Sequence, residues 1–162
     1  MSIFLRRIYL LVGAAAVILA VLAVACGDDD DDDGGNGDGG GGTTVDAVLT
    51  EFAIEADPDS VSAGDITFKA ANEGEEEHEL VIMRTDLAPD ALPTKDDGSV
   101  DEEGAGVELI DEIEEFAGGG SEEITVNLAA GKYVLFCNLV EEEDGEPDSH
   151  YAEGMHTGFT VE

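Results

Sequence analysis

Residues 124 to 137 read ITVNLAAGKYVLFC, and apolar side chains recur at every second position on both sides of the Ala130-Gly131 step. This alternation is typical of half-buried strands, and the small residues between the two halves favour a turn. The alternating residues are Ile124, Val126 and Leu128, followed by Tyr133, Leu135 and Cys137. The segment therefore predicts two strands joined by a turn.

Similar alternation recurs upstream and at the C-terminal end. The apolar positions are Val48, Phe52 and Ile54, then Ile66, Phe68 and Ala70, then Leu80 and Ile82, and finally Phe159 and Val161. Residues 60–64 and 72–74 contain the Gly, Ser and Asn that favour turns, so they are predicted to separate the strands.

Two further segments complete the fold prediction. Residues 86–106 contain two prolines and an Asp-Asp-Gly turn signal, which predict a long surface loop. Residues 107–116 carry apolar side chains near helical spacing, but we interpret them as a strand or an irregular segment. Seven or eight short strands with little helix predict an all-β fold, an antiparallel Greek-key β-sandwich.

The charge balance excludes one class of partner. The chain has 162 residues, with 40 Asp and Glu against 6 Lys and Arg, and a net charge of −34. Nucleic-acid binding needs many cations to replace condensed counterions, so we expect no nucleic-acid partner. Self-repulsion among so many carboxylates suggests either a salt-rich environment, where the charges are screened, or simple selection for solubility.

The N-terminal residues predict an export signal and an anchor. Arg6 and Arg7 precede an apolar run over residues 8–25, which ends in small residues before Cys26. The sequence around Cys26 resembles a bacterial lipobox, although Ala23 stands where leucine is usual. The resemblance implies that residues 1–26 are a signal peptide and lipobox, with Cys26 as the lipid anchor. An uncleaved membrane helix is the alternative, and both predict a chain exported to the outer face of the cytoplasmic membrane.

The residues that follow predict a spacer. Residues 28–33 are six aspartates, and residues 34–42 are nearly all glycine. Such a segment buries no apolar surface and repels itself, so residues 27–44 are predicted to form a disordered tether. Residues 45–162 then form the single folded domain.

Cys137 is the functional focus of this domain. If lipid modifies Cys26, Cys137 has no intramolecular partner and is an inert buried thiol, an intermolecular link or a metal ligand. Its neighbours favour a ligand, because His150 and Met155 follow at His-x4-Met spacing and His78 precedes at the head of a predicted strand. A thiolate, two imidazoles and a thioether suit copper better than zinc or calcium.

These motifs resemble the small blue copper proteins, the cupredoxins of the plastocyanin, azurin and halocyanin kind. The resemblance covers residues 45–162 and is carried by Asn72-Glu73-Gly74-x3-His78, by Gly131-x-Tyr133-x3-Cys137 and by His150-x4-Met155. It implies that His78, Cys137 and His150 are the strong ligands of one type 1 copper ion and that Met155 is the axial ligand.

The resemblance also implies an electron carrier rather than an enzyme. It implies that a solvent-facing edge of His150 passes the electron to a redox protein with a basic docking face, and we expect His156 to be a solvent-facing neighbour. Three histidines cannot supply the trinuclear centre of a multicopper oxidase. A copper-capture or copper-delivery module without redox turnover and a metal-free interaction domain are the alternatives.

The loop between the last ligands departs from the family pattern. Relatives usually place two to four residues between the cysteine and the second histidine, whereas twelve intervene here. Most of them, Glu141 to Ser149, form an acidic insertion. We expect this insertion to leave the fold and return to the same point, because closure entropy grows slowly with loop length.

Overall fold

The structure is a computed structural model, and it describes residues 42–143 and 145–162. The predicted signal peptide with its lipid anchor at Cys26, and nearly all of the predicted tether, lie outside these residues. Within the described ranges, no helix is both long enough and apolar enough to cross a bilayer.

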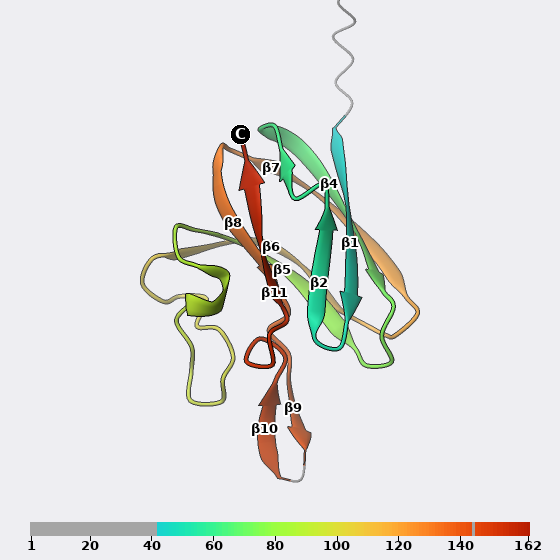
Figure 1. Cartoon of the computed structure of the whole chain (residues 1–162), viewed down its shortest axis with the longest axis vertical. Coiled ribbons are helices and arrows are strands. Elements are labelled where there is room, and N and C mark those ends of the chain that lie inside the picture. The colour runs from blue at the N-terminus through green and yellow to red at the C-terminus, as the bar shows by residue number, and fades with distance from the viewer. Residues whose placement is uncertain (1–41, 144) are drawn as a thin grey trace, which may run out of the picture. The chain divides into compact units, whose positions relative to one another are not determined.

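Strands make up nearly all of the regular structure (Figure 1). They are β1 (Thr43–Thr50), β2 (Ala53–Asp57), β3 (Ser60–Val61), β4 (Gly64–Asn72), β5 (His78–Thr85), β6 (Val107–Phe116), β7 (Ser121–Leu128), β8 (Gly131–Phe136), β9 (Val140–Glu143), β10 (Glu146–Ser149) and β11 (His156–Val161). One short 3-10 turn, η1, spans Pro89–Ala91.

The strands form two sheets and a separate hairpin, which confirms the predicted β-sandwich. One sheet has the order β2-β1-β4-β7 and the other has the order β3-β11-β8-β5-β6. Most neighbours are antiparallel, but β1 pairs with β4 and β11 pairs with β3 in parallel. The sheets are therefore mixed rather than purely antiparallel, because the chain crosses between sheets before these strands pair.

The main core lies between the two sheets, where the inward side chains of each strand meet. Phe68 from β4 and Phe159 from β11 pack edge to face across the sandwich, with ring centroids 5.3 Å apart. Both rings are fully buried, together with Ile66, Leu80 and Leu135. Aromatic and branched side chains on alternate positions thus supply the apolar burial that stabilises the fold.

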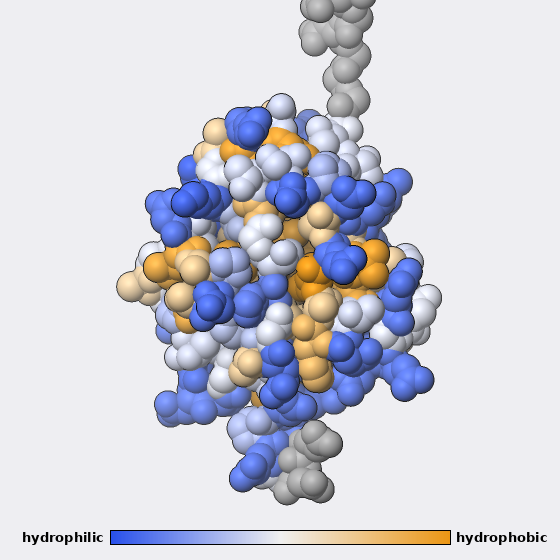
Figure 2. Space-filling model, viewed as in Figure 1, coloured by the Kyte–Doolittle hydropathy of each residue, from blue (hydrophilic) through white to orange (hydrophobic). Residues whose placement is uncertain are grey.

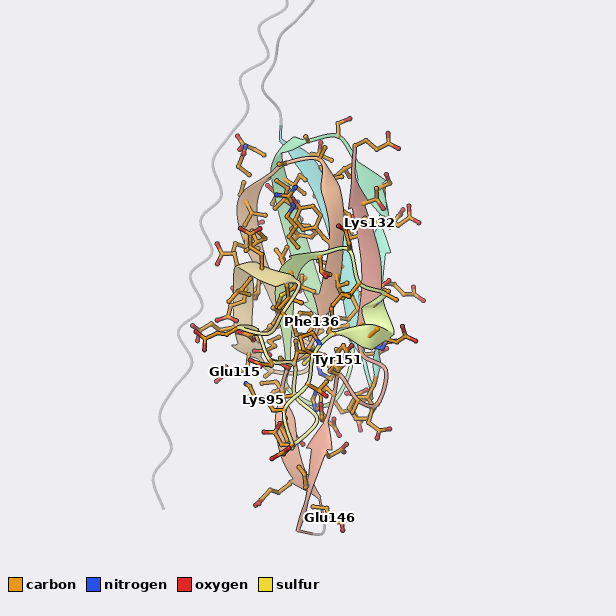
Figure 3. All side chains as sticks on the ribbon, turned by 90° about the vertical axis from the view of Figure 1, so that its left-hand side faces the viewer. Lys95, Glu115, Lys132, Phe136, Glu146 and Tyr151 are labelled. Carbon is orange, nitrogen blue, oxygen red and sulfur yellow. The ribbon has the colours of Figure 1, made fainter. Side chains whose placement is uncertain are left out.

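A second apolar cluster covers the outer face of β5 and β8. Residues 86–106 run over this face and bury Leu92 and Val100 against Phe136 and Tyr151. The rings of Phe136 and Tyr151 are 5.9 Å apart (Figure 3). The predicted surface loop is therefore partly a core element, which explains why β8 is apolar on both faces.

The first strand differs from its prediction in register. Val45, Ala47 and Leu49 face the core, whereas Val48 is only half-buried. The prediction treated Val48, Phe52 and Ile54 as one alternating strand, but a turn at residues 51–52 separates β1 from β2 and breaks the phase. Strand β1 also begins at Thr43, which pairs with Ile66, so the last two residues of the predicted tether belong to the sheet.

The surface is strongly polar. Hydrophilic side chains cover much of the face shown in Figure 2, with smaller apolar areas between them. Among large apolar side chains of the described residues, Leu87 and Leu109 are the exposed ones. Such a surface fits the acidic composition and the need to remain soluble.

Candidate metal centre

His78 is the first residue of β5, and the turn before it fixes its position. The side chain of Asn72 is buried and donates from Nδ2 to the carbonyl oxygens of Glu76 at 2.8 Å and Phe116 at 3.1 Å. Its Oδ1 accepts from the backbone N–H of Gly74 at 3.0 Å. These bonds tie the turn to the end of β6, so β5 begins at a defined place.

Cys137 and the last two candidate ligands are joined through their backbones. The N–H of Cys137, the residue after β8, donates to the carbonyl oxygen of Met155 at 3.1 Å. The N–H of Met155 donates to the carbonyl oxygen of His150 at 3.0 Å. The His-x4-Met segment is therefore a closed turn held against the end of β8, and Met155 is fully buried there.

The three strongest candidate donors converge on one buried point. His78 Nδ1 lies 3.3 Å from His150 Nδ1, and Cys137 Sγ lies 3.3 Å from the same nitrogen. The three donor atoms lie within 4.8 Å of one another. Metal–nitrogen and metal–sulfur bonds of about 2.0 and 2.3 Å place donors about 3.5 to 3.7 Å apart in a trigonal plane, so the cluster matches the size of one metal ion.

Known structures share this architecture. No family model and no curated protein matches the chain. The chain is similar to a dithionite-reduced auracyanin from the photosynthetic bacterium Roseiflexus castenholzii, with 25% identity over 76% of this chain and 99% of that one and a TM-score of 0.52. The fold and the donor set are those of a cupredoxin.

Two other similar structures lie at lower identity. Auracyanin A from Chloroflexus aurantiacus, described as a "blue" copper protein, is 21% identical over 75% of this chain and 100% of its own, with a TM-score of 0.49. Rusticyanin from Thiobacillus ferrooxidans is 20% identical over 75% of this chain and 79% of its own, with a TM-score of 0.44.

The Cys137 thiol is protonated at neutral pH in the metal-free protein. Burial raises the pKa of Cys137 to about 12. The backbone N–H of Glu79 points to Sγ at 3.5 Å and partly offsets this effect by stabilising the thiolate. A thiolate here therefore needs a cation beside it, and a soft metal ion supplies that charge.

The two histidines are also arranged to bind a cation. Burial lowers the pKa of His78, and the facing ring of His150 lowers it further, so the His78 ring is neutral at pH 7. The Nδ1 atoms of the two rings face each other at 3.3 Å. Two imidazole nitrogens at this separation can both bind one soft cation, which makes this donor set a good fit for copper.

One expectation drawn from the resemblance is wrong. His150 was expected to present an edge to solvent, but the residue is only 1% exposed. The ring of Phe52 covers it, with centroids 5.0 Å apart, and Glu76 approaches its Nε2 at 3.8 Å. His156 is partly exposed and packs on Tyr151, and it is outside the donor cluster.

The acidic insertion behaves as expected. Strands β9 and β10 form an antiparallel hairpin in which Val140 pairs with Ser149. The N–H of His150 donates to the carbonyl oxygen of Leu139 at 3.0 Å, immediately below the hairpin. His150 thus reaches the donor cluster despite the long insertion, which projects away from the sandwich in Figure 1.

Sequence reasoning missed two residues that contact the site. Glu51 lies in the turn between β1 and β2, and its Oε1 is 3.5 Å from His78 Nε2. Phe52 follows it and covers His150. No spacing or motif could reveal either residue, because only the pairing of β1 with β4 brings this turn to the end of β5.

A polar network ties Cys137 to the loop over residues 86–106. Oε1 of Glu79 accepts from the backbone N–H of Asn138 at 2.8 Å. Asn138 Oδ1 accepts from the N–H of Val100 at 2.6 Å, and its Nδ2 donates to the carbonyl oxygen of Val100 at 3.2 Å. The residues next to two candidate ligands are therefore cross-linked to each other and to the loop.

Proposed function

We propose that this cupredoxin is an exported, membrane-tethered electron carrier that holds one type 1 copper ion. The observation that carries the proposal is the convergence of His78 Nδ1, Cys137 Sγ and His150 Nδ1 in one buried cluster. The thiolate and two imidazoles would be the strong ligands, and the buried thioether of Met155 would be the axial ligand. The similarity to auracyanin supports the same assignment.

Copper in such a site supplies a one-electron couple between Cu(I) and Cu(II). The protein's part is to hold its donors still, and each donor is fixed by backbone bonds at the end of a strand or turn. Low ligand movement between oxidation states favours fast electron exchange. All three donors are buried, which supports a metal centre that carries electrons rather than a thiol nucleophile open to a substrate.

The docking partner is proposed to be a redox protein with a basic face. The hairpin beside His150 exposes Glu141, Glu142 and Glu146, and Figure 3 shows Glu146 at its end. Lys132 lies at the other end of the domain, and Lys95 lies nearer to the hairpin. Complementary charge would steer a cationic partner toward the metal end, and salt would weaken this steering.

The membrane anchor is proposed from the N-terminal residues. A lipid on Cys26 would hold the domain at the outer face of the cytoplasmic membrane, with the Asp- and Gly-rich segment as a spacer. Cys26→Ser should move the protein from the membrane fraction to the soluble exported fraction, whereas Cys137→Ser should not. A membrane-bound protein that keeps residues 1–25 would instead support the uncleaved helix.

Copper titration of the full-length protein tests the function. One equivalent of Cu(II) should produce an intense visible absorption band from the thiolate, and this band should disappear in Cys137→Ser. The band should also bleach on reduction and return on oxidation. A colourless protein that binds only Cu(I) would favour copper capture or delivery, and a protein that binds no copper would favour a metal-free interaction domain.

A further inference from the structure

The Nε2 atom of His78 is a buried polar atom without a hydrogen bond. His78 is fully buried, and its Nε2 has no hydrogen-bond partner among the described residues. Oε1 of Glu51 lies 3.5 Å from it. A buried donor without an acceptor costs about 1 to 3 kcal/mol of folding free energy. The nearby Glu51 carboxylate is a suitable acceptor for this nitrogen.

Glu51 is held in place by a turn from another part of the chain. Its Oε1 accepts from the backbone N–H of Glu75 at 2.6 Å and of Glu76 at 2.9 Å. Gly74 leaves room for this carboxylate, because a Cβ at that position would overlap the Glu51 carboxyl group. Both backbone N–H groups point at the same carboxylate oxygen, so they fix the orientation of the Glu51 side chain.

We propose that Glu51 is the positioning residue for His78, accepting a hydrogen bond from Nε2–H so that Nδ1 presents its lone pair to the metal. This inference rests on the proposed copper site. Carboxylates that accept from a ligating histidine fix its tautomer and ring orientation and raise its basicity. A more basic imidazole binds Cu(II) more strongly than Cu(I), so Glu51 favours the oxidised state.

Glu76 is less well suited to the same role at the other histidine. Its Oε2 is 3.8 Å from His150 Nε2, and its side chain is 42% exposed, compared with 30% for Glu51. Solvent competes for an exposed carboxylate and weakens its hold on a donor. Glu51 is therefore the carboxylate with the stronger effect on the site.

The first experiment compares copper affinities of the full-length protein. Glu51→Gln removes the charge but retains an acceptor oxygen for the two backbone N–H groups. We expect it to weaken Cu(II) binding tenfold or more relative to Cu(I), measured by chelator competition, which equals a rise of about 59 mV in reduction potential per tenfold change. Glu55→Gln removes the same charge from an exposed position on β2 and should change the ratio less than twofold. Equal shifts in the two variants would overturn the proposal.

The second experiment needs no copper and separates this inference from the proposed function. Nitrogen-15 spectra of the metal-free wild-type protein should show hydrogen on Nε2 of His78 and none on Nδ1. Glu51→Ala removes the acceptor and should shift the ring toward the other tautomer, and Glu51→Gln serves if the alanine variant does not fold. Hydrogen on Nδ1 in the wild-type protein would overturn the role of Glu51. Failure of the wild-type protein to bind copper would overturn the proposed function alone.

Discussion

The backbone N–H of His150 donates to the carbonyl oxygen of Leu139 at 3.0 Å, so the chain returns to its starting point after the hairpin β9–β10. Leu139 follows Cys137 by two residues, and the bond therefore holds both candidate ligands at one end of the sandwich. Loop closure here depends on the base of the hairpin and not on its length.

The first prediction is that the hairpin can be removed without loss of the metal site. Replacing residues 141–148 by Asn-Gly keeps Val140 and Ser149 paired through a tight hairpin turn. The visible band and the copper affinity should remain within about threefold of the wild-type values. Loss of the band would show that the hairpin itself positions His150.

The same shortened variant should respond differently to charged redox agents. A cationic metal complex should exchange electrons more slowly with the shortened protein than with the wild-type protein, and the difference should vanish at high salt. An anionic complex should react faster with the shortened protein. Stopped-flow traces of the visible band measure both rates.

The second prediction concerns the link between Asn138 and the loop over residues 86–106. Asn138→Ala leaves both backbone groups of Val100 without their side-chain partner, and Val100 is fully buried. The free energy of unfolding of the copper-free protein, measured in urea, should fall by about 2 to 3 kcal/mol. Asn127→Ala removes an exposed bond to Asp65 and is the control, with an expected loss below about 0.5 kcal/mol. Similar losses in both variants would contradict the structural role of Asn138.

The candidate ligands were more predictable from sequence than the arrangement around them. His78, Cys137 and His150 are the residue types that one metal requires, and the structure brings all three together. Histidine and cysteine are rare in this chain and are typical metal ligands, so they can be identified from sequence. A carboxylate such as Glu51 cannot be singled out in this way, because it is one of 40 acidic residues. Its role arises only from where the turn between β1 and β2 lies.

The sequence predicts where the strands lie along the chain, but it does not predict which strands pair with one another. Alternation identified β7 and β8 on either side of the Ala130-Gly131 turn, yet the two strands belong to different sheets. Periodicity reports which side chains face the core and carries no information on the neighbour or its direction. The parallel pairing of β1 with β4 was missed for this reason, although it brings Glu51 to His78.

The third prediction follows from the net charge of −34. Repulsion among carboxylates destabilises the compact state, and the Debye length falls from about 10 Å at 0.1 M salt to about 3 Å at 1 M. The urea midpoint of the copper-free protein should therefore rise between 0.1 M and 2 M potassium chloride, with an unchanged slope. A midpoint that stays constant would mean that the surface charge serves solubility without affecting stability.

The last prediction is a pH dependence set by Glu79. Burial raises the pKa of Glu79 from 4.5 to about 7, with the hydrogen bond from Asn138 N–H opposing the shift and the nearby carboxylates of Glu112 and Glu102 contributing to it. The folded protein therefore keeps a proton that the unfolded chain releases, so this group's contribution to stability falls as pH rises from about 4.5 to 7. Ionisation of buried Glu79 above pH 7 therefore lowers the free energy of unfolding by at most about 3 kcal/mol.

Glu79→Gln should remove this cost, because glutamine can still accept from Asn138 N–H but carries no charge. Urea unfolding of the copper-free protein should show the variant to be more stable than the wild-type protein at pH 8 and equally stable at pH 4. Glu77→Gln removes the same charge from an exposed position nearby and is the control for the loss of one surface charge. If the Glu79→Gln difference were the same at both pH values, the pKa of Glu79 would be the same in the folded and the unfolded protein, and the polar network beside Cys137 would hold a charge at pH 8.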